Sequence, residues 1–215
     1  EDIGYASLIL SILAGRYPDS LDDFASHSEQ IATWIEEADV KSLYGLGDLL
    51  NNLGQRDHEL TEAIIDLINP QIIDDKLSQI GISDAYVWGY FLGRLCYAAS
   101  HKWIMQLKNS LDSSALQSLF AGVEVDDVEI NSLDELAEGL LCFDDSLAIK
   151  LVDSALPQIA SAFNNDIIEF QDITHIIWFV LGFAPDFLRQ EYEPSSDQKQ
   201  IAYKLADSIN EIGRA

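Results

Sequence analysis

The sequence predicts an all-α fold, a right-handed α-solenoid of about five helix-turn-helix repeats, on three observations. First, a leucine recurs before a turn at Leu13, Leu53, Leu95, Leu140 and Leu181, in steps of 40, 42, 45 and 41 residues, a period of roughly 42. Second, each of these leucines lies in an apolar stretch that is too long for a typical strand. Third, the segments that follow the turns keep their apolar residues on one helical face. A short helical unit cannot bury its own apolar faces, whereas stacked copies can.

The first helix of each predicted repeat is strongly apolar. Several of these helices are apolar on most faces, which predicts burial on both sides. Asp84 and Ser132 are candidate N-caps, and Ser132 with Glu135 fits the capping-box pattern. The five predicted helices cover residues 3–15, 40–54, 84–99, 132–143 and 173–183.

A turn with a capping residue follows each apolar helix. Asp57, Ser100 and Asp144 are the predicted N-caps of the next helix, with Asp19 and Asp186 near the corresponding positions after Pro18 and Pro185. The turn therefore predicts where the second helix of each repeat begins.

The second helix of each repeat is amphipathic. Residues 58–68 and 145–156 place isoleucine, leucine and valine at the i, i+3, i+4 spacing of a single face. Pro70 and Pro157 are expected to interrupt the helix and start a third, shorter one, because proline removes a hydrogen bond and clashes with the preceding turn. The segment 108–122 lacks a proline, so we expect it to continue with less of a bend.

The linkers and the two ends complete the expected organisation. The segments 123–131 and 164–172 are predicted loops between repeats. We expect one helical-repeat domain over 1–215, and a fragment of a larger chain, since the first helix is as apolar as the internal ones and has no polar capping repeat. The polar segment 196–212 is expected to form a capping helix.

Composition limits the classes of function. The net charge is −25, with 37 acidic and 12 basic residues, and Lys150 is the only Lys or Arg between Asn109 and Leu188. This charge disfavours direct binding to nucleic acid and to an anionic membrane surface, both of which need Lys and Arg. It is compatible with a basic protein partner or with mimicry of DNA, and also with a surface that serves only solubility. No apolar run is long enough to span a bilayer, so we expect a cytoplasmic protein.

Neither a catalytic nor a metal-binding motif is recognisable. There is no phosphate-binding loop, no zinc-protease motif and no nucleophile elbow. Cys96 and Cys142 have no Cys or His at ligand spacing, and two buried free thiols are expected. The four histidines, His27, His58, His101 and His175, are expected on the surface or at helix starts. We therefore expect no enzyme and no cofactor.

Two groups of residues are candidates for partner binding. The acidic stretch Asp126, Asp127, Glu129, Asp134, Glu135 and Glu138 is a candidate contact surface for a basic protein, although adjacent acids in so acidic a chain are usually solvated. The adjacent pairs Asp22/Asp23, Asp74/Asp75 and Asp144/Asp145 are expected at solvated turns. Trp34, Trp88, Trp103 and Trp178 are expected mainly in the core, with an exposed binding anchor as the alternative.

The segments "IIWFVLGFAPDFL" (176–188), "LLNNLGQRDHEL" (49–60) and "DIGYASLILSIL" (2–13) carry a resemblance to a known class of repeat. Together they resemble the C-terminal helical arrays of bacterial STAND-type NTPases, which are similar to tetratricopeptide repeats. No unit has the full Asp-Pro-Glu-Leu turn of those arrays, and the NTPase motifs are absent, so no catalytic residue is implied. The resemblance implies a sensor array that binds a protein trigger, often a phage protein in antiviral members.

The sequence leaves three hypotheses. The first is a non-enzymatic protein-binding or sensor module of a larger cytoplasmic signalling or antiviral-defence protein. The second is a free-standing acidic protein that mimics nucleic acid, or that acts as an adaptor or inhibitor of a basic partner. The third, an enzyme with a pocket in the solenoid, needs buried convergent polar groups that the sequence does not show.

Overall fold

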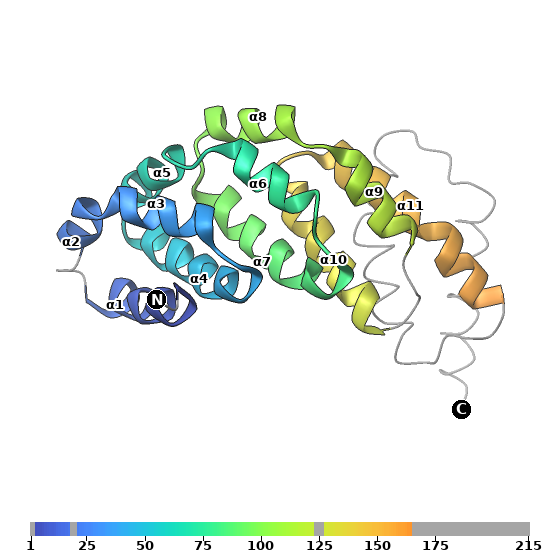
Figure 1. Cartoon of the computed structure of the whole chain (residues 1–215), viewed down its shortest axis with the longest axis horizontal. Helices are drawn as coiled ribbons and strands as arrows, with labels where there is room; N and C mark the ends of the chain where they lie inside the picture. The colour runs from blue at the N-terminus through green and yellow to red at the C-terminus, as the bar shows by residue number, and fades with distance from the viewer. Residues whose placement is uncertain (1–2, 18–20, 123–126, 165–215) are drawn as a thin grey trace, which may run out of the picture.

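The computed structural model describes residues 3–17, 21–122 and 127–164, and over these ranges the chain is helical with no strand (Figure 1). The all-α prediction is therefore confirmed for this part of the chain. The helices are α1 (Ile3–Arg16), α2 (Leu21–Ser26), α3 (Ser28–Glu37), α4 (Val40–Arg56), α5 (His58–Asp66), α6 (Pro70–Leu77), α7 (Ile82–Ala98), α8 (His101–Ser110), α9 (Ser113–Ala121), α10 (Asp127–Leu141) and α11 (Asp145–Asn164).

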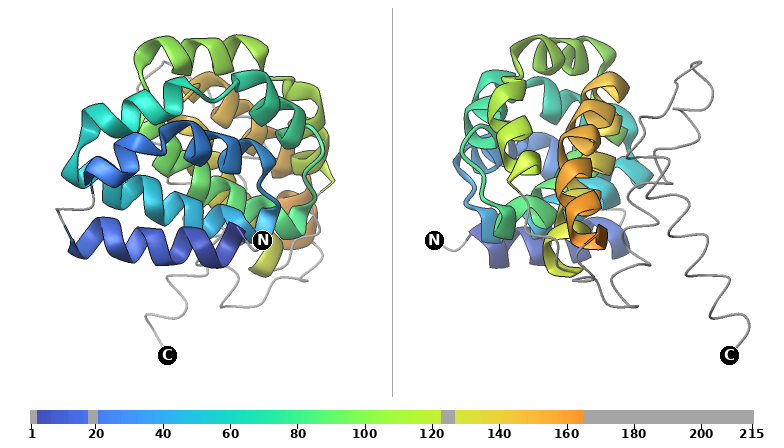
Figure 2. Two further views of the ribbon diagram at one scale, coloured as in Figure 1. Left: turned by 60° about the vertical axis from the view of Figure 1, so that its left-hand side comes forward. Right: turned by 90° about the vertical axis from the view of Figure 1, so that its right-hand side faces the viewer.

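The helices lie in two layers. In the first layer α1, α4, α7 and α10 lie side by side in sequence order, each packed against the next (Figures 1 and 2). In the second layer α3 packs against α5, α6 against α8, and α9 against α11. The packing of α5 on α4 and α7, and of α11 on α10, joins the two layers.

The core lies between these layers. Because α4 has α1 on one side and α7 on the other, Leu46, Leu49, Leu50 and Leu53 are all fully buried. In the second layer Trp103 is 2% exposed, and its indole Nε1 donates a hydrogen bond to the Ile68 carbonyl oxygen at 2.8 Å. The prediction that internal apolar helices are buried on both sides is confirmed for α4 and α7.

The predicted turn chemistry is confirmed at four positions. Asp57 accepts from the Leu60 backbone N–H at 2.9 Å and Ser100 from that of Trp103 at 3.1 Å, so both cap the helices that follow. Asp144 accepts from the backbone N–H groups of Ser146 and Leu147 at the start of α11. Pro70 is the first residue of α6. Proline is tolerated there because a backbone N–H at this position would have no acceptor within the helix.

Two predicted helix starts are wrong. Asp84 does not cap α7, because the helix begins at Ile82 and Gly81 takes the N-cap position. Ser132 does not open a capping box, because α10 begins at Asp127 and Ser132 is buried inside it. The prediction of a loop over 123–131 is accordingly wrong from Asp127 onward, where the chain is helical. Packing of α10 along α7 extends the helix into a stretch whose sequence alternates like a strand.

The predicted break at Pro70 is confirmed, but the predicted break at Pro157 and the predicted continuity of the segment 108–122 are wrong. α11 continues through Pro157 to Asn164. Its packing on α9 supports this continuity, since the Gln158 side chain beyond the proline donates to the Ala121 carbonyl oxygen at 2.6 Å. Conversely, the segment 108–122 does break without a proline, because Asp112 accepts from the Ser114 N–H and caps a new helix, α9.

The predicted fifth apolar helix (173–183) and the polar capping helix (196–212) lie outside the described residues. The same holds for Asp19, Asp186, His175 and Trp178. These predictions stay open.

The junction between α7 and α10 depends on two glycines. A Cβ on Gly89 would lie well inside contact distance of the Glu135 carbonyl oxygen, and a Cβ on Gly139 would lie 2.9 Å from the Cα of Gly89. Both obstacles are backbone, which cannot rotate away as a side chain can. The two helices therefore pack backbone against backbone, a spacing that only glycine permits here.

We expect Gly89→Ala to lower the free energy of unfolding by about 3 kcal/mol or more, at the upper end for an overpacked core, because α7 and α10 must separate. Urea unfolding followed by circular dichroism measures this. Gly93→Ala is the matched control on α7, since a Cβ there meets nothing within 4 Å. The control should be neutral or stabilising by up to about 1 kcal/mol, because alanine is the better helix former. Equal effects of the two substitutions would contradict the close packing.

Candidate functional site

The structure distributes the predicted acidic stretch unevenly. Asp126 lies outside the described residues, and Asp127 and Glu129 belong to the first turn of α10. Asp134 and Glu135 are half-buried on the same helix, and Glu138 is exposed one turn further on. The three described carboxyl groups share one helix but not one solvated face.

Burial changes the charge of this acidic group. Burial first, and then the carboxylates of Glu138 and Glu135, raise the pKa of Asp134 to about 7. Burial and Glu138 also raise the pKa of Glu135, although the Arg94 guanidinium on α7 lowers it. A partly protonated, half-buried carboxyl resembles a phosphate poorly, which weakens the interpretation of α10 as a mimic of nucleic acid.

One member of a predicted solvated pair is buried. Asp74 is 5% exposed, and its carboxylate accepts from the Asp112 backbone N–H at 2.9 Å and from Gln71 Nε2 at 3.0 Å. It thereby joins α6 to the start of α9. Asp22, Asp23, Asp75 and Asp145 are exposed as predicted.

A second candidate for the functional site, besides the acidic residues of α10, is α1. The face of α1 that packs against α4 is made of small residues. Ser7, Ser11 and Ala14 are the buried residues of this helix. A Cβ on Gly45 of α4 would lie 2.5 Å from the Ser7 hydroxyl oxygen, so α1 and α4 approach closely. Asn52 of α4 donates to the Ser11 hydroxyl at 2.8 Å, which fixes the register of the two helices.

Large apolar side chains lie on the opposite face of α1. Tyr5 is 71% exposed, Ile9 58% and Ile12 48%, and this helix carries no acidic residue in a chain of net charge −25. The described residues include eleven exposed large hydrophobic side chains, and six of them are on α1 or directly after it. We call this surface the α1 face; it comprises Tyr5, Leu8, Ile9, Ile12, Leu13 and Tyr17.

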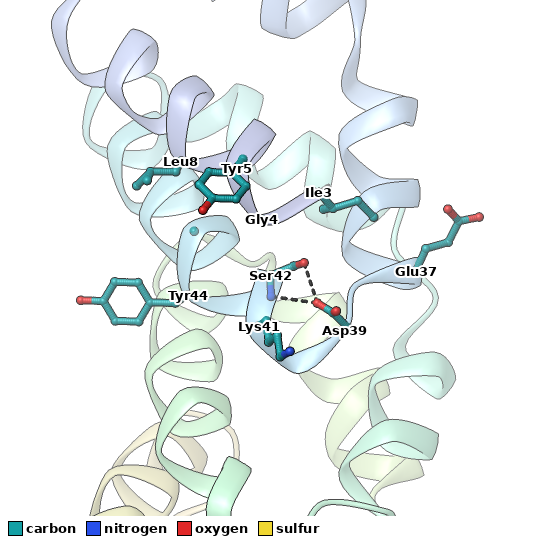
Figure 3. Close-up of a pocket in the computed structure, with 10 residues that line it drawn as sticks. Ile3, Gly4, Tyr5, Leu8, Glu37, Asp39, Lys41, Ser42 and Tyr44 are labelled. Carbon is teal, nitrogen blue, oxygen red and sulfur yellow. Dashed lines mark hydrogen bonds between the residues drawn. The ribbon is translucent and has the colours of Figure 1, made fainter. Parts of the chain in front are cut away.

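A hollow of about 740 Å³ opens at the N-terminal end of α1, between it and the start of α4 (Figure 3). Ile3, Tyr5 and Leu8 line one side, and Glu37, Asp39, Lys41 and Tyr44 are among the residues of the other. The Asp39 carboxylate caps α4 by accepting from the Ser42 hydroxyl at 2.6 Å and from its backbone N–H at 3.0 Å. The hydrogen bond from the Ser42 hydroxyl is the largest cause that lowers the pKa of Asp39, and the bond from the Ser42 backbone N–H adds to it. The slight burial of Asp39 acts in the opposite direction. Asp39 therefore has a structural role.

A second hollow, of about 360 Å³, lies between α1 and the α2–α3 segment. Its walls are mostly apolar and come from Leu10 and Leu13 of α1 and from Phe24, Ile31 and Trp34 opposite, with Asp23, His27 and Gln30 also lining it. It adjoins the α1 face, because Leu13 belongs to both. The apolar surface is thus continuous from the exposed side of α1 into this hollow.

The structure separates the tryptophans into two kinds. Trp88 and Trp103 are buried in the core, as the main prediction stated. Trp34 is only partly buried and lines the second hollow, which fits the alternative of a binding anchor. The sequence signal for the α1 face is that α1 contains no Asp or Glu. The apolar pattern by itself predicted that this surface would be buried in a core.

The described histidines agree with expectation, but one cysteine does not. His27, His58 and His101 are exposed at or beside helix starts, as predicted. Cys142 is exposed and Cys96 is half-buried, so the prediction of two buried thiols is wrong, because Cys142 lies past the end of α10.

Two further searches cover only the part of the chain that the structure describes. No three His, Cys, Asp or Glu side chains there are placed to hold a metal ion together. None of the helices in that part combines the length and the apolar character needed to cross a bilayer.

Comparisons with protein-family models, with curated proteins and with solved structures give no match to this chain. The function must therefore be argued from the geometry.

We expect Asp134 to make stability depend on pH. A carboxyl whose folded pKa of about 7 exceeds its unfolded value of 3.8 favours folding when protonated, so this contribution falls as pH rises between these values. Asp134→Asn should therefore raise the melting temperature relative to wild type at pH 8 and change it little at pH 4. Thermal unfolding across this range measures the difference. An equal effect at both pH values would contradict the raised pKa.

We expect Asp74→Ala to lower the free energy of unfolding by roughly 1–3 kcal/mol, because the Asp112 N–H loses its hydrogen bond to a buried carboxylate. Asp75→Ala is the control, since Asp75 is exposed and also accepts from Gln71. Chemical unfolding of both variants should show a loss for Asp74 only. Comparable losses would mean that the contact with Asp112 is not what stabilises this junction.

Proposed function

We propose that this chain is a non-enzymatic protein-binding module, built as an α-solenoid, that docks a helical segment of a basic partner against the α1 face. The observation that carries the proposal is the concentration of exposed large apolar side chains on one helix, whose only charged residue is Arg16 in its last turn. Soluble proteins seldom expose a contiguous apolar patch of this kind unless something binds there.

The solenoid part of the proposal is supported by contacts between successive helices of the first layer. The hydrogen bonds from Asn52 to Ser11, from Tyr90 to Asp48 and from Arg94 to Asn51 join residues 41, 42 and 43 positions apart. These separations agree with the proposed period of roughly 42 residues. They recur from α1 to α4 and from α4 to α7, as expected for stacked units that each contact only their neighbours.

The shape of the surface favours a helix as the ligand. An amphipathic helix binds by laying apolar residues, spaced at i, i+3, i+4 and i+7, into an apolar groove. The α1 face offers such a track along its length, and the second hollow beside it can accept one large side chain between Leu13 and Trp34. Tyr and Trp at such a surface are frequent hot spots.

The charge around the surface favours a basic partner. The α2–α3 segment, 21–37, borders the second hollow and contains Asp22, Asp23, Glu29, Glu36 and Glu37 but no Lys or Arg. A partner helix that lies along α1 therefore has an acidic wall on one side, which complements Lys or Arg on its flank. A second copy of this chain is disfavoured, because each copy carries a net charge of −25.

The proposed biological setting is a sensor or scaffold region of a larger cytoplasmic signalling or defence protein. Its support is the resemblance of the apolar helix and turn segments to the sensor arrays of STAND-type NTPases. In that setting the docked helix belongs to the trigger protein.

The test uses a labelled probe peptide, an amphipathic helix with leucines on one face and lysines along its flanks. Fluorescence anisotropy measures its affinity for wild type and for the double variant Ile9→Gln with Ile12→Gln. Glutamine keeps the helix propensity and removes the apolar surface. We expect the double variant to bind at least tenfold more weakly, a difference of about 1.4 kcal/mol.

Two controls make the result specific. Leu67→Gln with Met105→Gln removes two exposed apolar side chains elsewhere and should leave the affinity unchanged. A peptide with glutamates in place of the lysines should bind more weakly than the basic probe, by a margin that shrinks in high salt. Equal binding by the α1 variant and by wild type would contradict the proposal. A dimer of this chain that the α1 variant dissociates would instead identify a second copy as the occupant.

A further inference from the structure

The fold brings the two cysteines of the chain together. Cys96 is close to the C-terminal end of α7, and Cys142 directly follows α10. Gly89 of α7 lies against Glu135 of α10, and Cys96 and Cys142 each follow seven residues later, which is about two helical turns. Because α7 and α10 pack along each other, the two thiols lie at the same level and interact. The pair is not at a motif spacing in the sequence, so only the packing of the two helices produces it.

The two thiols have different environments. Cys142 is exposed, whereas Cys96 is half-buried beneath it. The Cys96 thiol donates to Cys142 and thereby lowers the pKa of Cys142 to about 7, although burial and the Asp145 carboxylate oppose this. The same hydrogen bond, together with burial, raises the pKa of Cys96. The neighbouring Asp144 is neutralised by an ion pair with Lys108 of α8 at 3.2 Å.

We propose that Cys96 and Cys142 form a peroxide-sensitive dithiol, in which exposed Cys142 reacts first and Cys96 closes a disulfide between α7 and the end of α10. The geometry carries this inference: one accessible thiol, and a second thiol in contact with it that solvent reaches poorly. Reactive cysteines of redox sensors have this combination of accessibility and a nearby resolving cysteine.

The chemistry balances with hydrogen peroxide as the oxidant. The Cys142 thiolate attacks one peroxide oxygen, the O–O bond breaks, and the departing hydroxide takes a proton to become water, which leaves a sulfenic acid on Cys142. The Cys96 sulfur then attacks the Cys142 sulfur, and the S–O bond breaks. The second hydroxide leaves with the Cys96 proton as water. Two thiols lose two electrons in total, and the peroxide is reduced to two waters.

The disulfide would have a mechanical effect at a defined junction. It would link α7 to the chain between α10 and α11, across the interface at which Gly89 and Gly139 already hold the backbones together. A covalent link between distant parts of the chain restricts the unfolded state and so raises the melting temperature. Oxidation is therefore expected to stabilise this junction.

The experiment treats the full chain with hydrogen peroxide and measures its intact mass under non-reducing conditions. Wild type should lose two hydrogens and regain them with dithiothreitol, and peptide mapping should show the link between Cys96 and Cys142. The Cys96→Ser variant should instead accumulate a sulfenic acid at Cys142 that dimedone traps. The Cys142→Ser variant should show little reaction at Cys96, because that thiol is protected.

Further readouts separate a reactive pair from two independent thiols. The rate of iodoacetamide labelling at Cys142 should follow a titration near pH 7 in wild type and shift upward in a Cys96→Ala variant, because alanine has no donor to replace the Cys96 thiol. The melting temperature should rise on oxidation of wild type and not of the double serine variant. Two free thiols after peroxide treatment, or equal reaction at Cys96 in the absence of Cys142, would overturn the proposal.

Discussion

The close approach of successive first-layer helices is the constraint on which the rest of the structure depends. Neighbouring helices approach closely where Gly45 meets Ser7 and where Gly89 meets Gly139. Larger side chains at these positions would keep the two backbones further apart. At this spacing α4 and α7 bury apolar side chains against a neighbouring helix on each side. The second layer contacts the first through α5 and α11. Polar bonds such as Asn52 to Ser11 and Arg94 to Asn51 then fix the register of each pair.

The same constraint explains why the α1 face is exposed. Close packing on α4 requires small residues on the inner side of α1, where Ser7, Ser11 and Ala14 are buried. The large side chains of α1 consequently lie on its other side, which no described helix covers. Among the described helices, α4 packs closely against a first-layer helix on each side, whereas α1 packs closely against α4 alone. The proposed docking surface is therefore a direct consequence of how the layer is built, and the acids of the α2–α3 segment are the reason for proposing a basic partner.

Much of the fold could be predicted from local sequence, and the failures have identifiable causes. Caps such as Asp57 and Ser100 act on their own helix, so the sequence around them predicts them. Ser132 fits the capping-box pattern equally well, but α10 extends past it because packing on α7 outweighs local preference. Pro157 fails as a breaker for the same reason. Of the candidate site, the sequence predicted acidic residues and a partner, but not the burial of Asp134 or the outward direction of Ile9 and Ile12, since both depend on the neighbouring helix.

The central claim is that a basic amphipathic helix docks on α1, and mapping where it binds tests this most directly. Amide hydrogen exchange can be measured on the full chain with and without a lysine-flanked amphipathic peptide at saturating concentration. The account predicts slower exchange in α1 and in the α2–α3 segment, with α7 to α10 unchanged. Protection confined to α10, around Asp134 and Glu138, would contradict it and would make the acidic helix the docking surface instead.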